Sequence, residues 1–124
     1  MAFDWGEYLK LAEFLVGKSG EGFGEEASAR CAVSRAYYAA FCHARDVAQA
    51  GSFRINQSGE DHKRVRDHYQ QRGMAPIAQK LDRLRQFRNA CDYEADIARL
   101  GDHFIQIAFI DARHILSKTK PPSK

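Results

Sequence analysis

The chain has 124 residues, of which 44% are hydrophobic and 28% are charged, and its formal net charge is +3. This length is enough for one compact domain that buries a single core without disulfide bonds or a metal ion. No apolar run approaches the roughly 18 residues that a membrane span needs, and the N-terminal residues lack the charged-then-apolar pattern of a signal peptide. We therefore expect a cytoplasmic protein that does not bind membranes.

Hydrophobic periodicity predicts helices and no convincing strand. The first helix is expected over Phe3–Val16, where apolar residues recur at three- and four-residue steps, and the glycines of GKSGEGFG end it. The second is expected over Glu25–Ala50; it is dense in alanine and begins with two acids, which suit the helix dipole. Its apolar positions spread over more than half of the circumference, so we expect it to be the central helix. The narrow strip left for water or for a site consists of Arg35, Cys42, His43 and Asp46.

The second half of the chain adds one short helix and two longer ones. A short basic helix is expected over about Glu60–Arg72, with Ser58 as a candidate cap. Pro76 suits the first turn of a fourth helix, which we expect to run to about Tyr93. The fifth helix is expected over about Ala95–Lys118, because its centre is apolar.

The order and lengths of these helices predict an all-α fold. Short connections between long helices favour antiparallel neighbours, and thus an up-and-down helical bundle of four main helices plus a short one. We expect residues 1–118 to form this single domain and residues 119–124 to form a flexible C-terminal tail. No repeat or low-complexity linker divides the chain.

The sequence gives no sign of a metal, a cofactor or a nucleophilic catalyst. The cysteines Cys31, Cys42 and Cys91 are widely spaced, and no CxxC or HExxH pattern is present. Ser34 lies on a helix without the GxSxG elbow that would present a nucleophile. GKSGEGFG follows a helix rather than a strand, which argues against a phosphate-binding glycine loop. We expect neither a metal nor a cofactor.

Positive charge is concentrated in the middle of the chain. The segment His62–Arg88 holds eight lysines and arginines against two aspartates, a net charge of +6, which leaves −3 for the rest. Such asymmetry is compatible with a solvated helix face and also with contact to a polyanion.

Arg88 interrupts the apolar stripe of the fourth helix. The stripe proceeds in steps of four, three and seven residues, and position 88 is its missing member; the stripe is Ile77, Leu81, Leu84 and Cys91. A charge on a buried face is costly unless it is paired and hydrogen-bonded. Asp92 is placed one turn away to pair with Arg88, and Asn89 and Tyr93 add hydrogen-bonding groups.

The sequence leaves three interpretations of Arg88 open. In the first, Arg88 and Asp92 form a partly buried pair that ties the fourth helix to the second. In the second, the guanidinium lines a cleft or a subunit interface and grips a phosphate bidentately. In the third, the pair serves only a dimer interface. Tyr38, on the apolar side of the second helix, is a core or interface aromatic in the first interpretation and orients Arg88 in the second.

Two segments resemble the HEPN-domain family of small helical proteins found in prokaryotic toxin–antitoxin and defence systems. SRAYYAAFCHARDVA (Ser34–Ala48) is similar to the family's second helix, and LRQFRNACDYEAD (Leu84–Asp96) is similar to its arginine-motif segment. The order and spacing of the expected helices agree with the family over nearly the whole chain. The resemblance implies a helical bundle that forms a homodimer, with two arginine motifs facing each other across a cleft. It also implies a toxin–antitoxin-like setting with a nucleotidyltransferase as partner protein.

The family's ribonuclease motif is incomplete in this chain. In active members, an arginine and a polar residue are followed within four to six residues by a histidine, which assists attack by the RNA 2′-hydroxyl. Arg88 and Asn89 match the start of the motif, but the positions open to the histidine hold Tyr93, Glu94 and Ala95. Counting from Arg85 instead, those positions hold Ala90, Cys91 and Asp92.

The missing imidazole removes a group that contributes on the order of 10²- to 10⁴-fold to such reactions. We therefore expect a catalytically degenerate protein that binds a nucleotide, RNA or a partner protein through an arginine-lined cleft. The expected ligand-binding residues are Arg35, Tyr38, Arg85, Arg88, Asn89, Asp92 and Tyr93. The alternative is a metal-independent ribonuclease toxin in which Arg88 acts with Asp92 and Tyr93.

Overall fold

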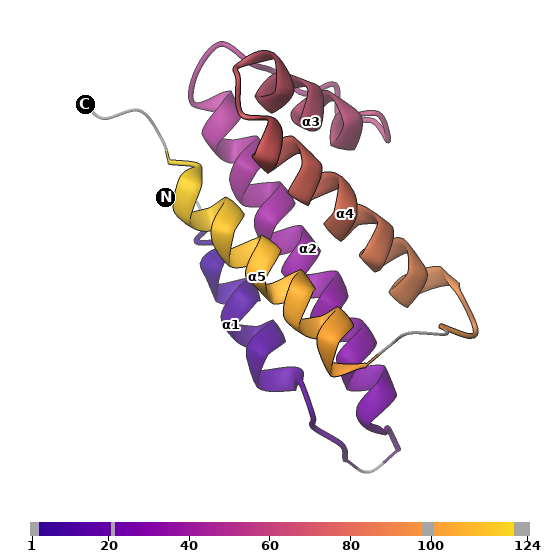
Figure 1. The fold of residues 1–124 in the computed structure, drawn as a ribbon. Helices are drawn as coiled ribbons and strands as arrows, with labels where there is room; N and C mark the ends of the chain where they lie inside the picture. Colours follow the sequence, from indigo (N-terminus) through magenta and orange to yellow (C-terminus); the bar gives the residue numbers. More distant parts are fainter. Residues whose placement is uncertain (1–2, 21, 98–100, 121–124) are drawn as a thin grey trace.

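The structure is a computed structural model that describes residues 3–20, 22–97 and 101–120. These residues form α-helices joined by short connections, which confirms the predicted all-α class. The main helices alternate in direction along the chain, as an up-and-down bundle requires (Figure 1). In the described ranges the helices are α1 (Gly6–Leu15), α2 (Glu25–Gln49), α3 (Asp61–Gln71), α4 (Ala75–Tyr93) and α5 (Asp102–Lys118).

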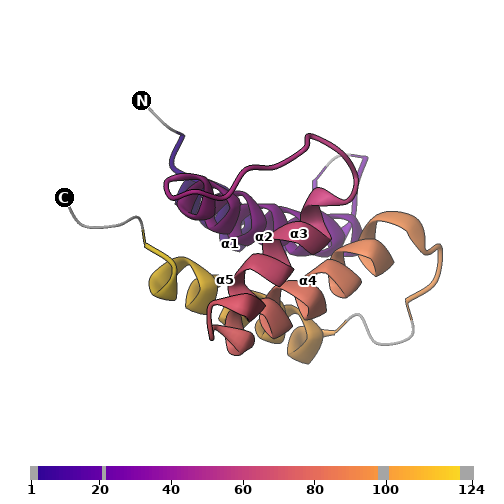
Figure 2. The ribbon, with the colours of Figure 1, turned by 90° about the horizontal axis from the view of Figure 1, so that it is seen from above.

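The long helix α2 is the centre of the bundle, as its broad apolar surface predicts. It contacts α1, α3, α4 and α5, whereas α3 packs only against α2 and α4 among the described elements. Seen from above, α3 crosses the end of α2 and α4 (Figure 2). Small side chains let the neighbouring helices approach α2 closely. The fully buried alanines along its length are Ala32, Ala36, Ala39, Ala40 and Ala44.

The predicted stripe of α4 is buried, with Arg88 among its members. Its apolar residues face α2 and are at most 4% exposed, and Arg88 itself is 9% exposed. Pro76 lies in the first turn of α4, as predicted. The apolar members of the stripe are Ile77, Leu81, Leu84 and Cys91.

The fifth helix begins at Asp102 rather than at Ala95, so the predicted start was wrong by seven residues. Arg30 of α2 explains the difference. Its guanidinium donates hydrogen bonds to the backbone carbonyls of Cys91 (3.2 Å), Glu94 (2.5 Å) and Ala95 (2.9 Å). These bonds satisfy carbonyls at the end of α4 and hold Glu94 and Ala95 outside a helix. Local periodicity cannot reveal a cap supplied by a residue more than 60 positions away.

The turn before α3 is organised by Asp61 rather than by the predicted cap Ser58. The Asp61 carboxylate accepts hydrogen bonds from the backbone N–H groups of Asn56 (2.8 Å) and Ser58 (3.0 Å). Burial acts to raise the pKa of Asp61, but these backbone donors outweigh it and lower the pKa below its usual value. The anchored turn fixes where α3 begins, and so fixes the position of His62 in its first turn.

The polar strip expected on α2 is largely covered. The Trp5 indole N–H donates to Asp46 (2.7 Å), and His43 Nε2 donates to the Thr119 carbonyl (2.7 Å). Cys42 is buried, so Arg35 is the exposed member of the strip. Thr119 is also buried, although we expected it to begin a flexible tail; residues 121–124 lie outside the described residues.

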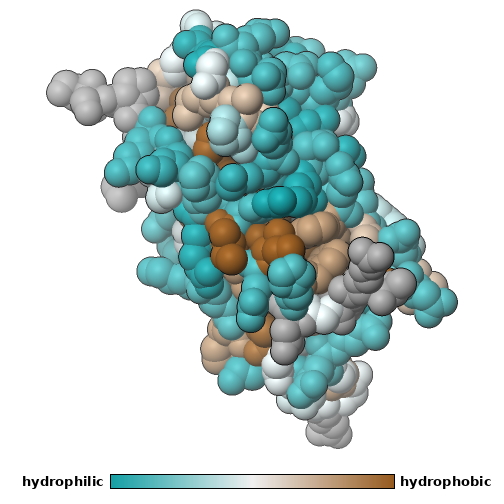
Figure 3. Space-filling view, viewed as in Figure 1, coloured by the Kyte–Doolittle hydropathy of each residue, from teal (hydrophilic) through white to brown (hydrophobic). Residues whose placement is uncertain are grey.

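The surface over α4 and α5 is mainly hydrophilic, with an apolar patch near its middle (Figure 3). A groove of about 460 Å³ between α4 and α5 is lined in part by Phe87, Phe104 and Ile107, and Ile110 of α5 is exposed. No helix in the described ranges combines the length and the apolar character that crossing a membrane requires.

Candidate functional site

Arg88 projects from α4 into a cage of tyrosine rings. Its guanidinium carbon lies 5.3 Å from the ring centre of Tyr37, 5.4 Å from that of Tyr38 and 5.9 Å from that of Tyr93. The first two rings come from α2 and the third from the last turn of α4. Cation–π attraction of this kind stabilises a guanidinium by about 0.5–2 kcal/mol, more when water is excluded. A cation–π contact supplies no hydrogen-bond acceptor to the N–H groups of the guanidinium.

The predicted pair between Arg88 and Asp92 is present only as a long contact. The nearest atoms, Arg88 Nη1 and Asp92 Oδ2, are 4.0 Å apart, which is too far for a hydrogen bond. Asp92 Oδ2 instead accepts a hydrogen bond from the Ser34 hydroxyl at 3.2 Å. Arg88 Nε is buried and has no hydrogen-bond partner among the described residues. The guanidinium is therefore held in place without being satisfied.

Two further arginines approach the same region and share one carboxylate. Arg85 donates to Asp82 Oδ1 at 2.9 Å, and Arg66 of α3 lies 3.6 Å from the same oxygen. The Arg85 hydrogen bond is the largest influence that lowers the pKa of Asp82. Arg66 Nη1 is buried and, within the described part of the chain, also has no hydrogen-bond partner. We call Arg66, Arg85, Arg88, Tyr37, Tyr38 and Tyr93 the arginine–tyrosine cluster.

The arginine–tyrosine cluster carries a net positive charge. Its three arginines face two carboxylates, Asp82 and Asp92, which leaves one positive charge uncompensated. A cavity of about 230 Å³ between α3 and α4 has Arg66 and Asp82 in its lining and so opens beside the cluster. This arrangement favours an anionic ligand over a cationic or neutral one.

His62 joins the cluster from α3, although no sequence pattern singles it out. Its Nδ1 atom shares a hydrogen bond with the Tyr37 hydroxyl, and its ring stacks on Phe41 at a centroid distance of 4.2 Å. Burial, followed by the positive charges of Arg88, Arg66 and Arg85, lowers the pKa of His62 below its ordinary value despite the opposing Asp61. Burial strongly raises the pKa of Tyr37, so its hydroxyl keeps its proton. The pair is therefore neutral at neutral pH.

Most of the predicted ligand-binding residues are brought together, but their roles differ. Arg85, Arg88, Asp92, Tyr38 and Tyr93 lie in or beside the cluster, as expected. The remaining two are peripheral, because Arg35 is exposed and lies over the rings of Tyr8 and Tyr38, and the Asn89 side chain makes no hydrogen bond within the described ranges.

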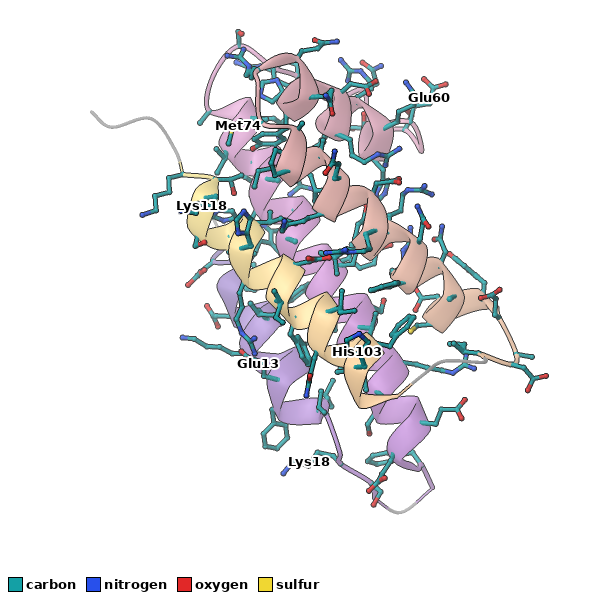
Figure 4. The ribbon with its side chains drawn as sticks, in the orientation of Figure 1. Glu13, Lys18, Glu60, Met74, His103 and Lys118 are labelled. Atoms are coloured by element: carbon teal, nitrogen blue, oxygen red, sulfur yellow. The ribbon has the colours of Figure 1, made fainter. Side chains whose placement is uncertain are left out.

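The residues that the prediction missed come from α2 and α3. Tyr37 is one of several aromatic residues on the apolar face of α2, and Arg66 belongs to the basic segment His62–Arg88 without a feature that sets it apart. His62 carried no local signal, because its position depends on how Asp61 anchors α3. Figure 4 shows α3 between the labelled Glu60 and Met74, across one end of the bundle.

The described residues contain no group of three or more histidine, cysteine, aspartate or glutamate side chains that could hold a metal ion. Cys31 is exposed, whereas Cys42 and Cys91 are buried. Burial raises the pKa of Cys91 to about 11 and also raises the pKa of Cys42, so both remain thiols at neutral pH.

Comparison with known proteins gives one whole-length similarity and no function. The chain is 27% identical over 146 aligned positions to the uncharacterized protein MJ0992 of Methanocaldococcus jannaschii, and the alignment covers 98% of this chain and 81% of that protein. No family model matches the chain, and no solved structure matches it. The resemblance to HEPN proteins therefore stays a prediction from the two sequence segments.

Proposed function

We propose that this chain is a HEPN-like protein that binds the phosphate and an adjacent base of RNA or a nucleotide in the arginine–tyrosine cluster, without cleaving RNA. One observation carries the proposal. Arg88 is 9% exposed, and its Nε donor has no partner among the described residues. A buried donor without a partner costs about 1–3 kcal/mol, and more when it is charged. A ligand that accepts from it recovers this cost.

A phosphate suits the guanidinium of Arg88 better than other common acceptors do. Its oxygens accept two parallel hydrogen bonds from the Nε–H and an Nη–H of one arginine. Arg66 Nη1 offers a second buried donor nearby, and the net positive charge of the cluster attracts the ligand over a longer range. Asp92, at 4.0 Å, is a weak competitor for Arg88 because its carboxylate also accepts from Ser34.

The tyrosines supply the second half of a nucleotide site. Tyr93 is 76% exposed at the mouth of the cluster, and Tyr38 is half-buried. An exposed ring beside a phosphate-binding arginine is where an unpaired base stacks, at about 1–3 kcal/mol per base. Because the Tyr93 side chain faces solvent, a rotamer change can uncover the Arg88 donors. In this proposal the ring moves from the guanidinium to the base when a ligand enters.

The homodimer and the nucleotidyltransferase partner belong to the same proposal. They rest on the HEPN resemblance, and the exposed ring of Tyr93 beside Arg88 supports an approach to this surface by a second chain. Sedimentation velocity at low micromolar concentration, with and without RNA, tests the homodimer. A monomer under both conditions would remove the two-motif cleft from the proposal.

Binding of a fluorescently labelled single-stranded RNA to wild type and to Arg88→Met tests the central claim. The affinity of the variant, measured by fluorescence anisotropy, should fall about tenfold or more, because charge-assisted hydrogen bonds are lost. The matched control is Arg113→Met. Arg113 is also an arginine on a long helix, but it pairs with Glu13 at the surface (2.7 Å) and should bind RNA as wild type does. Equal affinity of wild type and Arg88→Met would contradict the proposal.

The same proteins distinguish binding from catalysis. Each is incubated with mixed RNA in the presence of a chelator, and the RNA is then separated by size. We expect intact RNA with all variants. Cleavage by wild type that is lost in Arg88→Met would replace the binding function with a metal-independent ribonuclease.

A further inference from the structure

His62 occupies the α3 side of the cluster and is not used by the proposed phosphate contact. Its Nδ1 is engaged by Tyr37, whereas its Nε2 makes no hydrogen bond within the described ranges. The ring is only partly buried, so part of the His62 side chain can be reached from solvent. The charged and titratable groups that surround the imidazole come from three helices: Tyr37 and Tyr38 of α2, Asp61 and Arg66 of α3, and Arg85 and Arg88 of α4.

We propose that His62 is a further ligand-binding residue, which makes the site select a terminal phosphate monoester over the internal phosphodiester of an RNA chain. This inference rests on the proposed phosphate binding and specifies which phosphate is bound. Tyr37 holds the ring through Nδ1, and Nε2 donates to an oxygen of the phosphate that Arg88 binds. Arg88 therefore supplies the anion site. Protonation of His62 makes the affinity depend on the number of negative charges that the anion carries.

The charge of the cluster explains why a proton on His62 matters. With a neutral imidazole, the three arginines and two aspartates leave one positive charge, and Asp61 is offset by Arg64, 3.6 Å away. One positive charge matches a phosphodiester, which carries one negative charge. A terminal monoester, with a second pKa of about 6, carries close to two negative charges at neutral pH. The second charge is matched when His62 takes up a proton.

The proton balance of this step is simple. Without a ligand, burial and the neighbouring arginines keep the imidazole neutral. A bound dianion lies against the imidazole and favours its charged form, so the pKa of His62 rises in the complex. One proton moves from solvent to the imidazole, so that both ring nitrogens carry a proton; Nδ1–H then donates to the Tyr37 oxygen, and Nε2–H donates to the phosphate. No bond to phosphorus forms or breaks. Binding of a diester leaves the proton count of His62 unchanged.

Three versions of one short RNA test the selectivity: one with a 5′-phosphate, one with a 3′-phosphate and one with hydroxyl groups at both ends. Wild type should bind at least one phosphorylated RNA about tenfold more tightly than the hydroxyl form at pH 7, the gain expected of an added charge-assisted hydrogen bond. His62→Gln should lose this preference and bind the phosphorylated and hydroxyl forms with equal affinity. Equal binding of all three RNAs by wild type would overturn the inference.

Proton uptake provides a readout that a merely structural role of His62 would not change. Calorimetry in buffers of different ionisation enthalpy should show net proton uptake when wild type binds the preferred phosphorylated RNA near neutral pH. The hydroxyl form should show none. Proton uptake that is identical for the two RNAs, or that persists in full in His62→Gln, would contradict the assignment.

A second variant guards against misfolding of His62→Gln. Tyr37→Phe keeps the buried ring but removes the hydroxyl that orients the imidazole, so the preference, measured as the ratio of the two affinities, should fall to a few-fold. A Tyr37→Phe protein with the full wild-type preference would overturn the positioning of His62. Failure of wild type to bind any of the RNAs would refute the proposed function itself. Binding that depends on Arg88 but ignores the terminal phosphate would refute only the inference about His62.

Discussion

Two arginines of α4, five positions apart, differ in how the protein satisfies their charge. Arg83 donates from Nε and Nη2 to the two oxygens of Asp111 on α5, at 2.7 and 2.6 Å. Arg88 has its nearest carboxylate at 4.0 Å and a buried Nε without a partner among the described residues. Arg83 therefore has acceptors for its donors, whereas the buried Nε donor of Arg88 has none among the described residues.

The difference between Arg83 and Arg88 shows that the burial of an arginine does not by itself decide whether its donors have acceptors. Arg83 is half-exposed, but it neutralises Asp111, which is only 1% exposed. The hydrogen bond to Asp111 is also the largest influence that raises the pKa of Arg83. Arg88 is far more buried than Arg83, and aromatic rings rather than acceptors surround it. The open donors, more than the buried position, are the basis of the ligand site that we propose at Arg88.

The largest expected effect is a loss of stability when the ion pair between Arg83 and Asp111 is broken. Arg83→Met leaves the Asp111 carboxylate buried without its partner, so it should lower the free energy of unfolding by about 3 kcal/mol. Urea denaturation followed by circular dichroism measures this loss. The double variant Arg83→Met/Asp111→Leu should recover most of it, because it removes the buried charge as well. A single variant as stable as wild type would show that the pair is not structural.

A smaller effect is expected from the exposed ring of the cluster. Tyr93→Ala should weaken single-stranded RNA binding by about 1–2 kcal/mol, because a stacking platform is removed. Its stability should stay close to that of wild type, since the side chain is 76% exposed. Anisotropy and thermal unfolding of the same preparation separate the two properties. Wild-type affinity in Tyr93→Ala would place the base elsewhere.

Arg88→Met should change stability much less than Arg83→Met does. The substitution loses the contacts with three tyrosine rings, but it also removes a buried charge without a hydrogen-bonding acceptor. Because these effects oppose each other, we expect the free energy of unfolding to stay within about 1 kcal/mol of wild type. The urea experiment on Arg83→Met provides the comparison. A loss as large as that of Arg83→Met would mean that Arg88 serves the fold.

The stability of the ligand-free protein should also depend on pH through His62. The pKa of His62 is lowered in the folded state, so the unfolded chain binds the proton more readily than the native protein. Stability is therefore fully present above the unfolded pKa of about 6.5 and falls as the pH drops through the folded value. Urea midpoints measured from pH 7.5 down to pH 5 should decrease in wild type, with a smaller decrease in His62→Gln. An identical decrease in the two proteins would assign the effect to other groups.

The sequence predicts the features of the fold and of the candidate site that depend on local periodicity. The stripe of α4 identifies both the buried face and Arg88 as the residue that interrupts it, and the apolar surface of α2 identifies the central helix. Contacts between residues that are far apart in the sequence leave no such periodic pattern. Arg30 ends α4 through carbonyls more than 60 residues away, which delays α5 to Asp102.

The same limit explains the missed part of the site. His62 reaches Tyr37 only because the Asp61 carboxylate anchors the turn before α3 and the helix then packs across α2 and α4. The pairing of Asp92 with Arg88 was suggested by their four-residue spacing, but the Ser34 hydroxyl on α2 also claims the carboxylate. The spacing of residues within one helix gives no information about side chains of neighbouring helices that bind the same carboxylate.

The most direct test of a phosphate at Arg88 is the salt dependence of RNA binding. Association constants of wild type, Arg88→Met and Arg113→Met for one single-stranded RNA are measured over a range of salt concentrations. If Arg88 neutralises one phosphate, the slope of log K against log salt should become shallower by about 0.7 in Arg88→Met and stay unchanged in Arg113→Met. The same slope and affinity in Arg88→Met as in wild type would contradict the assignment of the phosphate to Arg88.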